Sequence, residues 1–283
     1  MSLAVALAVL LAAVTHASWN AMAHTIRDQL IAFTLIGGGA TVIGAVLAVF
    51  APLPASGAWP YLAASAALHT GYQTLLMRSF TLGDFGQMYP IARGTAPLVV
   101  TVLAVVFVGE SLNAWQAAGV AVASAGLVGV ALWGIRGSGA RPHWPALLAA
   151  LATGLSIAAY TVVDGVGVRA SGTPLGYIAW LMILEGLLIP GYALYRRRGE
   201  LLEQVRPYAV RGLLGAALSM TAYGLVLWAQ TRAPLAPVAA LRESSIIVGA
   251  AIGAVFFKER FGGVRIVAAG VLVVGIGLML RAG

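Results

Sequence analysis

The most constraining feature of this sequence is a series of apolar runs, each about twenty residues long and nearly free of charge. Of the 283 residues, 60% are hydrophobic and 9% are charged, and the mean hydropathy is +0.93. A soluble domain of this length exposes too much surface to hide so many apolar side chains. The chain is therefore predicted to lie in a lipid bilayer.

The apolar runs predict the fold class, an all-α polytopic membrane protein with ten transmembrane helices. They do not alternate apolar and polar residues as the strands of a membrane barrel would. The first run follows no basic segment and is longer than the core of a signal peptide, so it is interpreted as a spanning helix. The predicted spans are residues 3–23, 30–51, 59–80, 84–108, 113–134, 144–163, 174–195, 208–230, 233–257 and 263–281.

The sequence also repeats itself at an offset of 149 residues, which places Arg93 on Arg242 and Glu110 on Glu259. Two such units, residues 1–137 and 138–283, would each contain five predicted helices. Because five is odd, the second unit must enter the membrane in the opposite direction. Inverted repeats of this kind are typical of secondary transporters, whose substrate site lies at the repeat interface.

Short motifs in both units resemble the EamA-type domain of the drug/metabolite transporter superfamily. In the first unit they are residues 89–92, 97–99 and 109–112, followed by Gly119 and Gly126. The second unit echoes them at 236–238, 257–260 and 270–275. The resemblance implies two inverted five-helix repeats and a secondary carrier, usually an exporter of metabolites, without defining the substrate. Glu110 and Glu259 resemble the family's paired glutamates and are interpreted as structural, in capping or gating.

The basic residues indicate topology and not nucleic-acid binding. The formal net charge is +8, but the basic residues lie in short gaps between apolar runs. Twelve of the 17 fall in odd-numbered connections and three in even-numbered connections or at the C-terminus. The positive-inside rule then places both termini outside the cytoplasm, whereas the family resemblance implies termini inside. With no cysteine in the chain, disulfides and thiol nucleophiles are excluded.

Two arginines in the middle of predicted spans are the main candidate substrate-binding residues. An arginine at the bilayer centre costs roughly 2.5–3.5 kcal/mol even on a lenient insertion scale, so Arg93 and Arg242 need a reason to be there. Two guanidinium groups facing a central cavity would bind a phosphate, phosphonate, sulfonate or carboxylate. The alternative is that each is held in an ion pair, with Glu243, Glu185 or Asp164 as partner. Glu243, adjacent to Arg242, is included among the candidates.

Polar and aromatic residues on other predicted helices complete the candidate site. One face of the first helix carries His16, Trp19 and Asn20, and one face of the third carries His69, Tyr72 and Gln73, by their i, i+3, i+4 spacing. These faces either line the cavity, relaying protons through a histidine, or hydrogen-bond between helices. Tyr89 shares a face with Arg93, and Tyr223 is a further candidate on the eighth span.

Other function classes have less support in the sequence. No Walker loop, metalloprotease motif or nucleophile elbow is present, and channels usually carry a filter or a charged ring. An intramembrane enzyme remains a distant alternative. We expect no enzyme activity, no cofactor and no metal, in a monomer or weak homodimer of a bacterial-type inner membrane. The predicted function is transport of a small anionic or zwitterionic metabolite by alternating access, with a proton or another ion as candidate coupling partner. The alternative is an exporter of amino acids or neutral amphipathic compounds.

Overall fold

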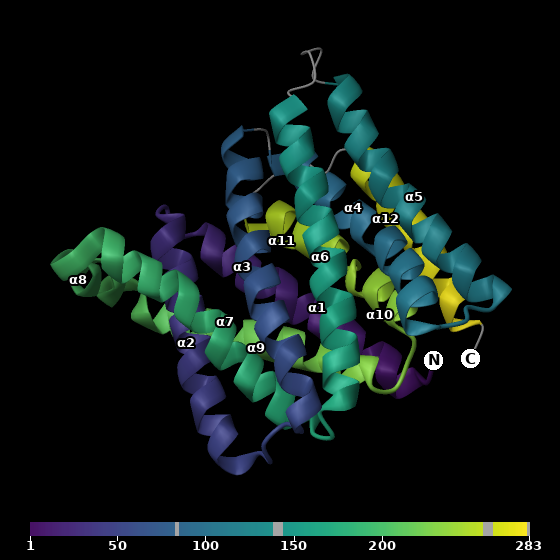
Figure 1. Cartoon of the computed structure of the whole chain (residues 1–283). Coiled ribbons are helices and arrows are strands. Elements are labelled where there is room, and N and C mark those ends of the chain that lie inside the picture. Colours follow the sequence, from purple (N-terminus) through teal and green to yellow (C-terminus); the bar gives the residue numbers. More distant parts are fainter. Residues whose placement is uncertain (83–84, 138–143, 257–262, 282–283) are drawn as a thin grey trace.

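A computed structural model describes residues 1–82, 85–137, 144–256 and 263–281, which form helices joined by short turns (Figure 1). No strand occurs among these residues, so the prediction of an all-α fold is confirmed. The helices are α1 (Leu3–His24), α2 (Gln29–Phe50), α3 (Trp59–Leu82), α4 (Phe85–Leu103), α5 (Ala114–Gly137), α6 (Trp144–Ala170), α7 (Pro174–Arg197), α8 (Leu201–Val205), α9 (Ala209–Gln230), α10 (Leu235–Arg242), α11 (Ser245–Phe256) and α12 (Gly263–Leu280).

Several helices begin at residues whose side chains cap the free backbone N–H groups of the first turn. The Ser2 hydroxyl accepts a hydrogen bond from Val5 N at the start of α1, and Asp28 accepts two at the start of α2. At α7 the Thr173 hydroxyl accepts from Gly176 N, and Pro174 follows at the first helical position. These are the residue types that favour helix starts, so local sequence explains where these three helices begin.

Among the described residues, four helical stretches are long and apolar enough to cross a membrane: Leu3–Ala23, Gln29–Phe50, Trp144–Ala170 and Pro174–Gln230, the last covering α7 to α9. Their outer faces are apolar as well. On α1 the exposed side chains Leu3, Leu7, Leu11 and Val14 form one stripe by helical spacing. A continuous exposed apolar face of this kind suits lipid, not water. The helices therefore support a multi-pass membrane protein.

The helices pack in pairs that join the two halves of the chain. α2 packs along α7 and α5 along α12, while α3 packs against α6 and α1 against α9. Two of these crossings are so close that glycines meet. Gly186 of α7 lies against the backbone of Gly37 in α2, and Gly275 of α12 lies against Gly119 in α5. Small residues at helix crossings allow tight packing in a bilayer, and here they serve contacts within one chain.

The crossing of α5 and α12 leads to a first prediction. A Cβ on Gly275 would lie 2.7 Å from both Gly119 O and Ala123 N, so valine there must push the two backbones apart. We expect Gly275→Val to destabilise the protein by about 1–3 kcal/mol, measured as a lower midpoint of thermal unfolding in detergent. The matched control is Gly277→Val on the same helix, where an added Cβ meets no atom within 4 Å. Equal midpoints for the two variants would contradict the crossing.

The predicted continuous span 233–257 is instead divided into α10 and α11. At the division, Glu243 N and Ser244 N donate to Ala240 O and Leu241 O, three residues back, where an α-helix would use four. The sequence there, Glu243-Ser244-Ser245, interrupts an apolar run with side chains that compete for backbone hydrogen bonds. Such a tightened turn in mid-helix often marks a functional hinge. Arg242 and Glu243 lie at this turn.

Candidate functional site

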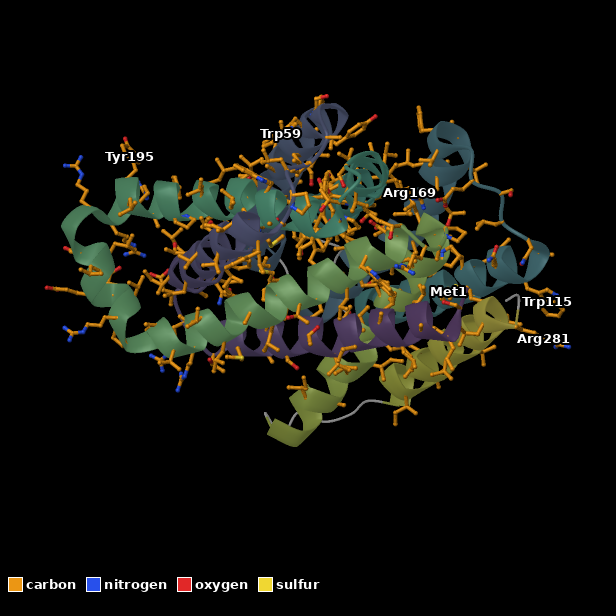
Figure 2. The ribbon with its side chains drawn as sticks, turned by 90° about the horizontal axis from the view of Figure 1, so that it is seen from below. Met1, Trp59, Trp115, Arg169, Tyr195 and Arg281 are labelled. Atoms are coloured by element: carbon orange, nitrogen blue, oxygen red, sulfur yellow. The ribbon has the colours of Figure 1, made fainter. Side chains whose placement is uncertain are left out.

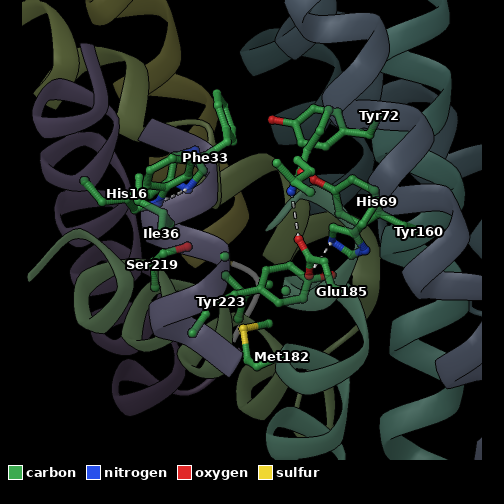
Figure 3. A pocket seen from close by; sticks show the side chains of 18 of the residues that line it. His16, Phe33, Ile36, His69, Tyr72, Tyr160, Met182, Glu185, Ser219 and Tyr223 are labelled. Carbon is green, nitrogen blue, oxygen red and sulfur yellow. Dashed lines mark hydrogen bonds and ion pairs between the residues drawn. The ribbon is translucent and has the colours of Figure 1, made fainter. Parts of the chain in front are cut away.

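A cavity of about 90 Å³ lies between helices of both halves of the chain (Figure 3). It is bordered by α1, α2 and α3 from the first half and by α6, α7, α9 and α10 from the second. The candidate residues that the structure brings together around it are His16, Trp19, His69, Tyr72, Gln73, Tyr223 and Arg242. Hydrophobic side chains such as Phe33, Ile36 and Met182 make up much of the remaining wall.

The two arginines are placed differently, in contrast to the expected pair facing one cavity. Arg242 lines the cavity, whereas Arg93 is buried against Glu243 and Ser245 and is not part of the lining. Its Nε lies 2.7 Å from Glu243 Oε2, and its Nη2 donates to Ser245 Oγ at 3.1 Å. Glu243 Oε1 also lies 3.8 Å from Arg242 Nε. The Glu243 carboxylate therefore lies between the two guanidinium groups, nearer to Arg93, and the ion-pair alternative holds for Arg93.

The candidate residues of α1 contact one another, since both Trp19 and Asn20 donate a hydrogen bond to His16. The indole N–H of Trp19 donates to His16 Nδ1 at 3.3 Å, and the two rings meet edge to face. Both residues line the cavity. Asn20 is not in the cavity wall, because its side-chain amide donates to the backbone oxygen of His16 at 2.8 Å. Its predicted role in binding therefore has no support from the geometry. The side chain of Tyr89 lies outside the described residues.

An aromatic cluster supports the opposite wall. The His69 ring stacks on Tyr160 with centroids 3.9 Å apart and meets Tyr223 edge to face at 5.3 Å. The Tyr223 hydroxyl in turn donates to Asp164, a fully buried carboxylate that also accepts the Tyr177 hydroxyl at 2.8 Å. Asp164 thus pairs with tyrosines and not with the arginines. This network holds the rings of α3, α6 and α9 in one orientation.

Glu185 of α7 is a cavity residue that was not among the candidate binding residues. Its Oε1 accepts from Gln73 Nε2 at 3.0 Å, and its Oε2 lies 4.0 Å from His69 Nε2 (Figure 3). Tyr160 is a second residue missed in this way. The signal for Glu185 was present, since it is the single acidic residue in the predicted span 174–195. The sequence also offers it as an ion-pair partner for the arginines, but in the structure its side chain contacts Gln73 and His69. In the described part of the chain, no group of three His, Asp or Glu residues could hold a metal ion.

Comparison with known proteins decides the family. Residues 144–281 match the EamA-like transporter family. The chain belongs to this family. The match covers the second half, so the resemblance of the EamA-type motifs in the first half remains a prediction. Membership makes the chain a membrane transporter of the drug/metabolite transporter superfamily. No curated protein matches it in sequence.

Solved structures share the fold of this EamA-like transporter, and 29 chains match. One crystal structure of a protein superposes with a TM-score of 0.70 at 18% sequence identity, over 100% of this chain and 98% of that chain. The likeness thus extends over both halves, including the first half that the family match leaves out. At this identity it shows a common fold and assigns no substrate.

In this EamA-like transporter, Glu110 closes one end of the helix bundle away from the cavity. Its Oε1 accepts from Arg169 Nη2 at 2.8 Å, and its Oε2 accepts from Leu235 N, the first residue of α10, at 2.7 Å. Arg169 also donates to Gln230 O and Ala233 O in the connection between α9 and α10. We call this set the Glu110 clamp. It agrees with the capping role expected for Glu110, while Glu259 lies outside the described residues.

Proposed function

We propose that this EamA-like transporter is a secondary carrier that moves a small anionic or zwitterionic metabolite, bearing a phosphate, phosphonate or carboxylate group, across a bacterial-type inner membrane. The observation that carries the proposal is Arg242, a guanidinium group in the wall of a cavity shared by both halves of the chain. Of its charged neighbours, Glu243 is already paired with Arg93 at 2.7 Å. Arg242 is therefore the cation that an anionic group can reach.

The second charge of the cavity favours a zwitterion over a simple anion. Glu185 lines the same cavity from α7 and makes no ion pair with a described lysine or arginine. A substrate with one negative and one positive group would satisfy Arg242 and Glu185 together, whereas a dianion would meet the Glu185 carboxylate. Because a buried charge without a partner is costly, the two residues select for substrates that carry both signs.

The cavity wall also gives specific support to the alternative, export of amino acids or neutral amphipathic compounds. Trp19, Phe33, Tyr72 and Tyr160 offer aromatic surface to a ligand. Small-molecule sites commonly combine such apolar walls with a few polar groups that orient the ligand. A neutral compound would use the aromatic wall and leave Arg242 without a new partner.

Alternating access is supported by the symmetry of helix packing. In two inverted five-helix units, 1–137 and 138–283, α1 corresponds to α6, α3 to α9 and α4 to the pair α10 and α11. The contact of α3 with α6 then has its counterpart in α9 with α1, and that of α4 with α6 in α11 with α1. A structure built of two like units can exchange the roles of its halves, which opens the central site to each side in turn.

A thermal-shift screen of the purified protein tests the substrate proposal. Ligands that bind the folded state raise its stability by RT ln(1 + [L]/Kd), roughly 2.7 kcal/mol at about 100 Kd. We expect stabilisation by small zwitterions or anions, lost in Arg242→Gln and kept in Arg211→Gln, which removes an exposed arginine of α9. If only neutral or cationic compounds stabilise the protein, and they stabilise Arg242→Gln as much as the parent, the exporter of amino acids or neutral amphipathic compounds replaces the proposal.

A further inference from the structure

Among the described acidic residues inside the predicted spans, Glu185 is the one that lines the cavity. The carboxylates of Asp164 and Glu243 are 0% and 1% exposed and do not line the cavity. The Glu185 side chain is 17% exposed and forms part of the wall. A proton or another small cation that enters the cavity therefore reaches Glu185 and not the other two.

The partners of the three carboxylates differ in charge. Glu243 has the guanidinium of Arg93 at 2.7 Å, and Asp164 accepts hydrogen bonds from two tyrosine hydroxyls. Glu185 accepts one hydrogen bond from the Gln73 amide, at 3.0 Å. Its other oxygen faces the His69 ring nitrogen at 4.0 Å, beyond hydrogen-bond distance. A carboxylate in a low-dielectric cavity without a cationic partner is neutralised by a proton or by a bound cation.

We propose that Glu185 binds a proton in the substrate-free cavity and gives it up when the positive group of a substrate binds. The exchange rests on the proposed transport function, whereas proton binding itself does not. In the step, the O–H bond of the Glu185 carboxylic acid breaks and the proton leaves to water. The carboxylate that remains takes the substrate cation as partner. One proton is released for each substrate bound, which couples transport to the proton gradient.

His69 is the candidate acceptor for the proton that Glu185 releases before that proton reaches water. Its Nδ1 lies 3.0 Å from the backbone oxygen of Ser65 and 3.1 Å from the Ser65 hydroxyl. Because a carbonyl oxygen only accepts hydrogen bonds, we assign the N–H to Nδ1. In that tautomer Nε2 carries a lone pair 4.0 Å from Glu185 Oε2, and a bridging water or a small approach of the two side chains would let it accept the carboxylic proton. The ring cannot turn away, because Tyr160 stacks on one face and Tyr223 meets it edge on. The geometry thus supplies an acceptor fixed beside the carboxylate.

The groups around Glu185 explain why it is the group that changes charge. α2, which packs along α7, contributes no titratable side chain over residues 29–50. The cation Arg242 borders the same cavity without an ion pair to Glu185. The other titratable groups in the described cavity wall are His69 and Tyr72 from α3, Tyr160 from α6, Tyr223 from α9 and His16 from α1. Asp164 and Glu243 lie outside the wall, in contact with Tyr223 and Arg242 respectively.

Infrared difference spectra of the substrate-free protein, recorded between neutral and alkaline buffer so that exposed carboxyls stay ionised, test proton binding by Glu185 directly. A protonated carboxylic acid shows a C=O stretch that an ionised one lacks. We expect such a band in the parent protein and its loss in Glu185→Gln. The matched control is Glu203→Gln, which removes an exposed carboxyl of α8 and leaves the band in place. A band that survives in Glu185→Gln, or that is absent from the parent, would overturn the proposal.

A second variant keeps the test decisive if Glu185→Gln fails to fold. Gln73→Leu removes the hydrogen-bond donor from Glu185, so the carboxylate loses stabilisation and the band should persist to higher pH. An unchanged transition in Gln73→Leu would count against Glu185 as its source.

The exchange is tested with a pH-indicator dye in weak buffer, using the zwitterion found by thermal shift. The exchange is supported if the parent protein releases protons when the zwitterion binds and Glu185→Gln does not. Stabilisation without proton release would overturn the exchange and leave the transport function standing.

Discussion

Glu243→Gln is expected to lower the free energy of unfolding by about 3–5 kcal/mol, the usual cost of removing one partner from a buried ion pair. Glutamine keeps the shape of the side chain but not its charge. Arg93, only 2% exposed, would lose the Glu243 carboxylate that lies 2.7 Å from its Nε, and Arg242 would lose the same carboxylate at 3.8 Å. The midpoint of thermal unfolding in detergent measures the loss.

Two further variants separate the ion pair from a general effect of substitution. Glu203→Gln, on the exposed side of α8, is expected to unfold like the parent. The double variant Arg93→Gln/Glu243→Gln removes both charges and should be more stable than Glu243→Gln alone. The reason is that the stability losses caused by substitutions at two contacting residues do not simply add. If the double variant loses the sum of the two single losses, Arg93 and Glu243 are not coupled.

Breaking the Glu110 clamp is expected to increase access to the far end of the bundle by about tenfold or more. Hydrogen bonds to charged groups contribute about 1.5–3 kcal/mol, and each 1.4 kcal/mol changes an equilibrium about tenfold. Because the chain contains no cysteine, a single introduced thiol reports access without background. Ala233→Cys suits this purpose, since Ala233 is 8% exposed and its carbonyl accepts from Arg169. We expect Glu110→Gln to raise the rate at which this thiol reacts with maleimide.

The control for the clamp is a neighbouring arginine in the same connection. Arg232 lies over the Trp228 ring at 4.7 Å and takes no part in the clamp, so Arg232→Gln removes a charge without releasing α10. It should leave the labelling rate unchanged. Equal rates in Glu110→Gln and the parent would mean that the clamp does not restrain this end of the bundle.

The helices could be predicted from sequence because short turns separate the apolar runs, and α1, α2 and α7 begin at capping residues. The predicted spans 30–51 and 174–195 differ from α2 and α7 by a few residues at most. The division of the span 233–257 was missed, because hydropathy averages over the polar residues Glu243 and Ser244. Their effect on backbone hydrogen bonding is local and does not change the apolar pattern on either side.

The candidate site could be predicted only in part, because sequence shows which polar residues lie in the membrane and not which of them pair. Arg93 and Arg242 occupy equivalent places at an offset of 149 residues, yet Glu243 pairs closely with one and leaves the other at the cavity. That choice depends on packing between α4 and α10. Glu185 could have been included from sequence, since an isolated acid in an apolar span needs a reason to be there.

Counterflow in proteoliposomes tests most directly whether this EamA-like transporter carries its ligand. The vesicles are loaded with the unlabelled compound that stabilises the protein most, and uptake of the labelled compound is followed. We expect transient accumulation with the parent protein and with Arg211→Gln, and none with Arg242→Gln. Uptake by the parent that does not exceed protein-free vesicles would contradict the carrier. Uptake that is equal in Arg242→Gln would retain the carrier and remove Arg242 from its binding site.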